Sequence, residues 1–286
     1  MKPFIILFLF LVCLAGNIVS QDLFDELGDW DDTESPVIKT FRSNRIVNLQ
    51  SVEIPHTGEL IFNIGHRFGS LQSGLYEMFG LDLATIRLGF DYGINRWLGA
   101  GIGRSSFEKT YDLYLKSRVI TQEGELNSPI SVSYYIASSY ATLRLVYPAD
   151  QDNFRGRSSI VQGLMISRKF SENFSLQFSP LWLRSSYLTE TQSPADKLSL
   201  GIAGRIRLTS ITHLNLEYIH EIIDDGFDNI NPLSLGFDIE TGGHVFQLFF
   251  SNTQGIIDKA YLVNTTGKWS NGDVFFGFTI TRVFYL

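Results

Sequence analysis

The feature that most constrains this chain is an alternation of apolar and polar residues with a period of two. Segment 86–94 is a clear case: Ile86, Leu88, Phe90, Tyr92 and Ile94 alternate with Arg87, Gly89, Asp91 and Gly93. A period of two places successive side chains on opposite faces of a β-strand. The same alternation runs through 60–67, 110–121, 198–208, 213–220, 233–240 and 276–281, and in a noisier form through 98–105, 130–142, 159–169, 174–187 and 244–251. The pattern predicts about 12 strands.

Alternation alone does not separate a membrane barrel from a soluble β-sandwich, but the lengths of the connections do. In bacterial outer-membrane barrels, short periplasmic turns alternate with longer extracellular loops. If the first strand runs outward, the periplasmic turns fall at 95–96, 123–128, 171–173, 209–210 and 241–243. The outer loops then fall near 69–84, 106–108, 147–158, 188–196, 222–232 and 252–273. We therefore predict an all-β fold, a closed antiparallel up-and-down transmembrane β-barrel of about 12 strands.

The first 20 residues are built like a secretory signal peptide. Lys2 precedes an apolar run from Phe4 to Leu14, and small and polar residues lead to Ser20. The run is shorter than the roughly 20 residues that a membrane-spanning helix needs. Cys13 is the only cysteine, so the chain after cleavage has neither a disulfide nor a thiolate metal site. We expect export in a Gram-negative bacterium and location in the outer membrane.

Aromatic residues and the end of the chain agree with that location. Aromatic side chains fall beside the expected periplasmic ends of strands, where an interfacial girdle belongs; they are Trp97, Phe170, Phe174, Phe284 and Tyr285. The sequence closes on an aromatic-rich strand, as substrates of the barrel-assembly machinery do. Outer-membrane lipid and that machinery are the expected partners. The formal net charge is −7 and no basic stripe appears, which argues against nucleic acid.

The stretch between the signal peptide and the first strand has a different composition. Residues 22–34 hold seven acidic residues and no basic one, together with Leu23, Phe24, Leu27 and Trp30. Such a stretch is usually solvated, and the alternative is a docking peptide for a periplasmic partner. The expected organisation is a signal peptide at 1–20, an acidic periplasmic N-terminal segment at 21–55 and the outer-membrane barrel at 56–286.

Several stretches resemble a family of β-barrel proteins from Bacteroidota, catalogued as a domain of unknown function. They are Phe41-Arg-Ser-Asn-Arg-Ile-Val-Asn48, Gly65-His-Arg-Phe-Gly69, Thr85-Ile-Arg-Leu-Gly-Phe-Asp-Tyr-Gly93, Gly103-Arg-Ser-Ser106 with Lys109-Thr-Tyr111, the stretch 231–247 and Gly277-Phe-Thr-Ile-Thr-Arg-Val-Phe284. The glycine-glycine-histidine motif at 242–244 is the most specific of them. The resemblance covers essentially the whole chain after the signal peptide. It implies a barrel in the outer membrane and no transferable activity.

A search for chemistry finds little in the sequence. His66, His220 and His244 share the outward parity, and only His213 has lumen parity, beside Asn215 and Glu217. No serine has a local signature of a Ser-His-carboxylate site, and the glycines of 99–103 alternate in a strand without the helix that a dinucleotide loop requires. We expect no enzyme activity, no cofactor and no metal site. An outer-membrane barrel hydrolase that uses His213 is the alternative, and a soluble secreted β-protein is a third class.

The enclosed lumen is the candidate site. Alternation assigns five basic and five acidic side chains to it: Arg87, Lys116, Arg118, Arg205 and Arg207, with Asp91, Asp112, Glu217, Asp238 and Glu240. These charges either satisfy one another and stiffen the barrel or line a polar, solute-selective channel. The predicted function is a porin-like outer-membrane barrel without catalytic activity, either a narrow solute channel or a structural, partner-binding protein. Loop 252–273 is expected either to fold inward as a constriction or to stand outside as a contact surface.

Overall fold

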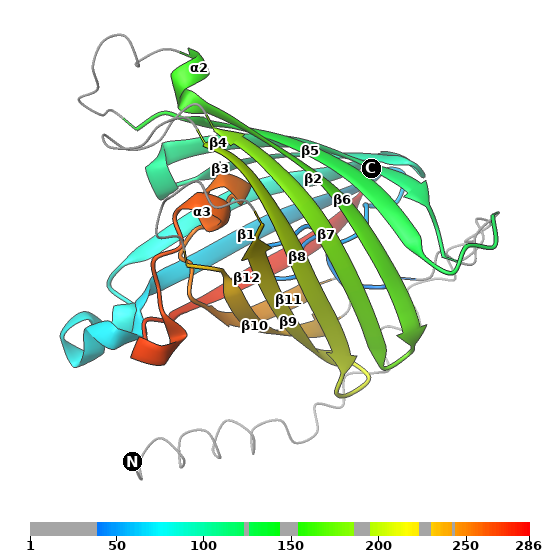
Figure 1. Cartoon of the computed structure of the whole chain (residues 1–286). Helices are drawn as coiled ribbons and strands as arrows, with labels where there is room; N and C mark the ends of the chain where they lie inside the picture. Colours follow the sequence, from blue (N-terminus) through cyan, green and yellow to red (C-terminus); the bar gives the residue numbers. More distant parts are fainter. Residues whose placement is uncertain (1–38, 123–125, 144–153, 186–194, 223–229, 242–243) are drawn as a thin grey trace. The chain divides into compact units, whose positions relative to one another are not determined.

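Twelve antiparallel strands close into a barrel in which each strand pairs with its sequence neighbours and β1 pairs with β12 (Figure 1). The computed structural model describes residues 39–122, 126–143, 154–185, 195–222, 230–241 and 244–286. The strands are β1 Glu59–Ser70, β2 Ala84–Asn95, β3 Leu98–Ser105, β4 Thr110–Ile120, β5 Ser131–Ala141, β6 Ser158–Ser171, β7 Phe174–Ser185, β8 Ala195–Arg207, β9 Thr212–Glu221, β10 Leu233–Thr241, β11 His244–Ser251 and β12 Phe275–Tyr285. The predicted fold class is confirmed.

The strands keep the alternation that the sequence predicted. On β2, Arg87 and Asp91 are buried inside the barrel, whereas Leu88, Phe90 and Ile94 are exposed on the outside. Closure pairs the backbone of every strand with two neighbours. Because hydrocarbon offers no hydrogen-bond partners, a sheet spans a bilayer only when it has no free edge. The outer face is therefore suited to lipid.

The connections sort into a short-turn end and a long-loop end. At the short-turn end, β2 and β3 are joined through Arg96 and Trp97, and β6 and β7 through Glu172 and Asn173. Helical turns lie at the long-loop end: η1 Leu71–Gly80, η2 Phe107–Lys109, α2 Phe154–Arg157, α3 Asp258–Val263 and η3 Trp269–Asn271. No helix in the described part of the chain is long and apolar enough to cross a membrane. In outer-membrane barrels the short turns face the periplasm.

The interior of the barrel holds a segment of the chain that precedes β1. Residues Thr40–Pro55, here called the plug, are buried at almost every position and fold back on themselves, with Arg45 bridged to Gln50. The sequence analysis predicts that these residues belong to an acidic periplasmic segment, 21–55. Residues 1–38, with the expected signal peptide and the acidic stretch 22–34, lie outside the described residues. The described part of 21–55 is inside the barrel.

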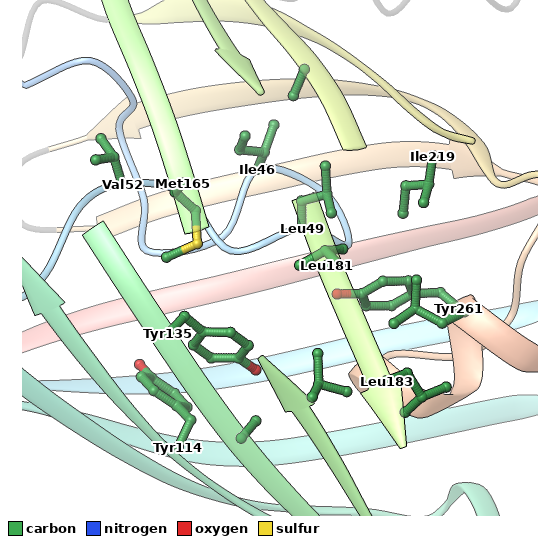
Figure 2. Close-up of a cluster of buried hydrophobic side chains, with 14 of the residues drawn as sticks. Ile46, Leu49, Val52, Tyr114, Tyr135, Met165, Leu181, Leu183, Ile219 and Tyr261 are labelled. Carbon is green, nitrogen blue, oxygen red and sulfur yellow. The ribbon is translucent and has the colours of Figure 1, made fainter. Parts of the chain in front are cut away.

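Apolar side chains hold the plug against one side of the barrel wall. Ile46, Leu49 and Val52 of the plug lie among inward-pointing residues of the strands (Figure 2). The wall residues of this core are Tyr114, Tyr135, Ala137, Val161, Met165, Leu181, Leu183, Ala203 and Ile219. Most of them lie in β5, β6 and β7, three of the segments whose alternation is noisy. Their inward positions are apolar because they face the plug and not water.

The connection between β11 and β12 closes the barrel from the long-loop end. Within it, Ile256, Ile257 and the α3 residues Asp258–Leu262 are buried. Helix α3 contacts β6 and β7, which lie across the barrel from the strands that the loop joins. Tyr261 of α3 belongs to the same apolar core as the plug (Figure 2). Of the two expectations for 252–273, the structure shows the inward fold.

Glycines in β2 and β3 provide the room that the filled interior needs. A Cβ atom on Gly93 would lie 1.8 Å from the carbonyl oxygen of His56, just after the plug. A Cβ atom on Gly101 would lie 2.2 Å from the Tyr114 ring. The alternating glycines of 99–103 therefore serve packing, as their position in a strand suggested.

Gly93→Ala should therefore destabilise the folded barrel, because the methyl group meets backbone that cannot rotate away. We expect a loss of about 1–3 kcal/mol, the usual cost of overpacking, measured by urea unfolding of the protein in detergent. Gly204→Ala is the matched control, since its nearest neighbour would be an ordinary 3.9 Å away. Equal stability of the two variants would contradict the close approach.

Candidate functional site

The tip of the plug is anchored on Glu217, an inward side chain of β9. The backbone N–H groups of Val47, Asn48 and Leu49 donate to the Glu217 carboxylate at 3.0–3.1 Å, and the Asn48 side-chain amide donates at 2.8 Å. Glu217 has no exposed surface. Hydrogen bonds to a charged group are stronger than neutral ones, and here they satisfy N–H groups that have no strand partner. A buried carboxylate is thus compensated by the backbone of the plug.

Lys116 of β4 provides the opposite charge for the same segment. Its Nζ donates to the carbonyl oxygens of Asn44, Ser51 and Glu53 at 2.9–3.0 Å. An ammonium group has three donors, and all three end on the plug backbone. Glu217 and Lys116 together bind the two kinds of backbone group that a loop would otherwise bury unpaired.

Neutral side chains from other strands complete the anchoring. Gln177 of β7 accepts from the Val52 N–H at 2.9 Å and donates to the Gln50 carbonyl oxygen at 2.8 Å. Gln247 of β11 donates to the Ile46 carbonyl oxygen at 2.9 Å. The plug is therefore hydrogen-bonded to the wall on several sides of the barrel.

Arg67 of β1 links the plug to the β11–β12 loop. Its guanidinium donates to the Asn48 side-chain oxygen at 2.8 Å and to the Thr253 carbonyl oxygen at 3.4 Å. It also lies over the Phe249 ring, 4.2 Å from the centroid. A cation over an aromatic face is attracted by the ring, which suits a charge that is only 2% exposed.

Asp258 of α3 is where loop, plug and wall meet. Its carboxylate accepts hydrogen bonds from Tyr135 of β5 and from Tyr261, and lies 3.7 Å from the Arg45 guanidinium of the plug. Burial, and then the nearby Asp258 charge, raise the pKa of Tyr261 well above its usual value, so the phenol stays protonated and donates. The neighbouring Lys259 pairs with Glu108 of η2 at 3.1 Å.

Some of the charged side chains that the sequence assigned to the lumen bind the plug, and others pair with one another. Buried among them are Arg87, Asp91, Asp112, Lys116, Arg205, Glu217 and Asp238, and half-buried are Arg118, Arg207 and Glu240. Arg87 of β2 pairs with Asp112 of β4 along the inner face of the wall, over the intervening strand β3, with Nε 3.0 Å from Oδ1. Asp91 accepts instead from the side-chain amides of Asn44 and Asn63.

Members of the set that lie near the short-turn end make rim contacts. Arg118 donates to the carbonyl oxygen of Arg96, and Arg207 to that of Thr209. Glu240 lies 3.4 Å from Arg42 of the plug. The sequence does not identify the plug residues themselves, because the prediction for 21–55 rests on the acidic stretch that precedes them. The irregular alternation in β5–β7 is the sequence feature that reflects the plug, because the inward positions of these strands are apolar where they face it.

The histidines show no catalytic arrangement in the described part of the chain. His213 is fully buried on the lumen side, and neither of its ring nitrogens has a hydrogen-bond partner there. A catalytic histidine needs an orienting acceptor on one nitrogen and a nucleophile near the other. His66 points outward and stacks on Phe278. The described residues also contain no group of three His, Cys, Asp or Glu that could hold a metal ion.

Two cavities lie between the plug and the wall near the joint of β1 and β12. One of about 150 Å³ is lined by Arg42, Glu53, Glu59, Asn63, Thr281 and others. A second, of about 30 Å³, lies beside Arg45, Arg67, Gly65 and Thr279. Both are lined by Ser43, Asn44 and Asn63. On this side of the lumen, space therefore remains between the plug and the wall.

If Glu217 is the main anchor, Glu217→Gln should loosen the tip of the plug, because the single amide oxygen of glutamine accepts fewer hydrogen bonds than the two oxygens of the carboxylate. We expect the amide protons of 47–49 to exchange about 30-fold faster, equivalent to about 2 kcal/mol of lost local stability. Hydrogen-exchange mass spectrometry on the protein in detergent measures this. Glu172→Gln, in the exposed turn between β6 and β7, is the control and should leave these amides protected; unchanged exchange in Glu217→Gln would disprove the anchor.

Known structures of similar fold are porins and other outer-membrane proteins. The NanC porin aligns with a TM-score of 0.50 at 10% identity, over 79% of this chain and 99% of that chain. The KdgM porin aligns with a TM-score of 0.48 at 6% identity, over 79% and 99%. The outer-membrane protein Omp33 of Acinetobacter baumannii aligns with a TM-score of 0.41 at 7% identity, over 79% and 98%. At these identities the likeness is one of fold.

No curated protein matches the sequence. A family model does match: the membrane-bound beta barrel domain (DUF5777) aligns with residues 41–284. The match begins inside the plug and ends in β12, so the plug is part of the family's domain and not an addition to it. With its closed 12-stranded fold and apolar outer face, this chain is an integral outer-membrane β-barrel that belongs to the membrane-bound beta barrel domain family.

Proposed function

We propose that this protein is a non-enzymatic, narrow solute channel whose lumen its own plug keeps closed. The observation that carries the proposal is the plug, which fills the barrel interior and takes up hydrogen-bonding groups that would otherwise line a pore. A 12-stranded barrel lies between small side-chain-filled barrels and open porins. Such a lumen needs an additional element to close it, and here the plug and the β11–β12 loop supply that element.

The proposed route for solute runs along the β1–β12 side. There the two cavities share lining residues, and the wall presents small or polar groups such as Asn63, Gly65, Thr279 and Thr281. The opposite side is closed by the apolar core. A shift of the plug tip away from Glu217 would widen the first side, and it would also draw Ile46 and Leu49 out of the apolar core.

The contact between Arg45 and Asp258 makes the β11–β12 loop part of the closure. Moving the loop outward would remove the carboxylate that faces Arg45 of the plug. Solute arriving at the long-loop end would therefore act on the plug through this ion pair.

A second candidate function is a structural or partner-binding barrel with a permanently seated plug. The charged anchors Glu217 and Lys116, both fully or almost fully buried, favour it. The acidic stretch 22–34 would then be the docking peptide for a periplasmic partner. The resemblance in sequence further favours a source among the Bacteroidota and insertion by the barrel-assembly machinery.

A barrel hydrolase is the enzymatic alternative, and it would depend on His213. The lack of a hydrogen-bond partner on either ring nitrogen in the described chain weighs against it. His213→Ala should leave the fold and any conductance unchanged, and loss of a hydrolytic activity in that variant would overturn the non-enzymatic proposal.

Current through planar bilayers tests the channel directly. The chain from residue 21 should be silent or show rare openings, whereas Glu217→Gln should show frequent single-channel steps because its plug is loosened. Asp258→Asn should act in the same direction, since it weakens the contact with Arg45. Persistent silence of both variants, once shown to be folded and inserted, would remove the channel and leave the structural barrel.

A disulfide lock shows whether the plug is the gate. A Cβ atom on Gly236 would lie 3.0 Å from Val47 Cγ2, so cysteines at 47 and 236 are within bridging reach. The chain from residue 21 has no other cysteine. In the Glu217→Gln background, the oxidised Val47→Cys/Gly236→Cys protein should be silent and should conduct after reduction. Equal current in both redox states would show that another element closes the lumen.

A further inference from the structure

The connection between β1 and β2 exposes a cluster of large apolar side chains at the long-loop end. We call residues 71–83 the rim loop. The exposed members are Leu75 (78%), Tyr76 (93%), Met78 (54%), Leu81 (51%) and Leu83 (53%). Loops that lie in water are rarely so apolar, and an exposed apolar patch marks an interaction with protein or membrane.

The rim loop has a defined fold, so the exposure is built into it. The Leu71 N–H donates to the Val274 carbonyl oxygen at 2.8 Å, which ties the start of the loop to the chain before β12. The loop returns so closely that a Cβ atom on Gly80 would lie 2.4 Å from Gly69. Met78 has a φ of 48°, in the left-handed region that side chains disfavour. Such strain persists only where the surrounding structure holds the residue in place.

Turns within the rim loop also satisfy part of its backbone. The Leu81 N–H donates to the Met78 carbonyl oxygen at 3.2 Å, and the Leu83 N–H to that of Gly80 at 3.1 Å. Unpaired backbone groups are costly in an apolar medium. Internal pairing of this kind is therefore what a loop in contact with lipid requires.

The apolar surface of the rim loop continues the lipid-facing surface of the barrel. Phe68 is the last outward aromatic residue of β1, and its ring stacks on Phe276 of β12 with centroids 5.7 Å apart. Phe276 also contacts Phe250 of β11, at 5.4 Å. Only Gly69 and Ser70 separate Phe68 from the rim loop. The aromatic belt on β1, β11 and β12 and the rim loop thus form one outward apolar face at the end of the barrel.

From this continuity we propose that the rim loop inserts into the outer leaflet of the membrane, at the boundary between headgroups and acyl chains. Its partner is lipid. Residues 71–83 contain no lysine or arginine and two acidic residues, Glu77 and Asp82, so binding rests on burial of apolar area and not on attraction to anionic headgroups. The loop then anchors the long-loop end of the β1–β2 hairpin in the bilayer.

Site-specific fluorescence in vesicles tests the proposal on the full chain. Tyr76→Cys introduces a single cysteine into the chain from residue 21, at a position that is almost fully exposed, so folding should be unaffected. The probe is an environment-sensitive fluorophore on that cysteine, in phosphatidylcholine vesicles that contain lipids with a shallow doxyl quencher. Ser270→Cys, in η3 at the same end of the barrel, is the matched control on a polar, exposed residue.

We expect the probe at 76 to emit in the blue, to be quenched by the doxyl lipid and to resist iodide added on both sides of the membrane. The probe at 270 should behave in the opposite way. Leu75→Cys should repeat the result for 76, and addition of anionic lipid should not change it. Quenching by iodide at both 75 and 76, equal to that at 270, would overturn the proposal. Shielding of these positions only in native outer membranes would point to a protein partner, and would overturn it as well.

Discussion

The structure depends on one constraint: a polypeptide removed from water must find partners for its backbone N–H and C=O groups inside itself. On the outside, closure of twelve strands meets this need, because each strand pairs with two others and no edge meets lipid. On the inside, the plug has no strand partner for its tip. Glu217 accepts the N–H groups of the tip and Lys116 donates to carbonyl oxygens on either side of it, so two opposite charges take the place of a neighbouring strand.

This arrangement changes the meaning of charge in the lumen. In an open pore, inward charges face water and select solutes; here Glu217 and Lys116 bind backbone, and Asp258 binds two phenols beside Arg45. A buried charge of this kind is costly to leave alone and valuable only while its partners are in place. The plugged arrangement therefore depends on these specific contacts. Loss of one anchor leaves several buried polar groups without partners at the same time. That coupling is what a gate requires, and it also describes a rigid structural core.

The sequence anticipated much of the candidate site and missed its occupant. Alternation placed Arg87, Lys116 and Glu217 on the inward face, and all three are buried there. It suggested charges paired across the interior, whereas Arg87 of β2 pairs with Asp112 of β4 on the same part of the wall. It could not reveal that Glu217 binds the N–H groups of residues 47–49, because a period of two reports which face a residue occupies but not what lies opposite. The apolar inward positions Met165 and Leu183 weakened the periodicity for the same reason.

The sequence by itself determined the barrel, the number of strands and the sorting of short turns from long loops. Each of these follows from local properties, namely period-two hydropathy and the positions at which it is interrupted. The tertiary structure alone decided that residues 40–55 fill the lumen, that α3 folds inward to meet them and that Asp258 faces Arg45. Those contacts join residues far apart in the chain, and their free energy comes from desolvation and close packing inside the closed barrel. No local pattern carries that information.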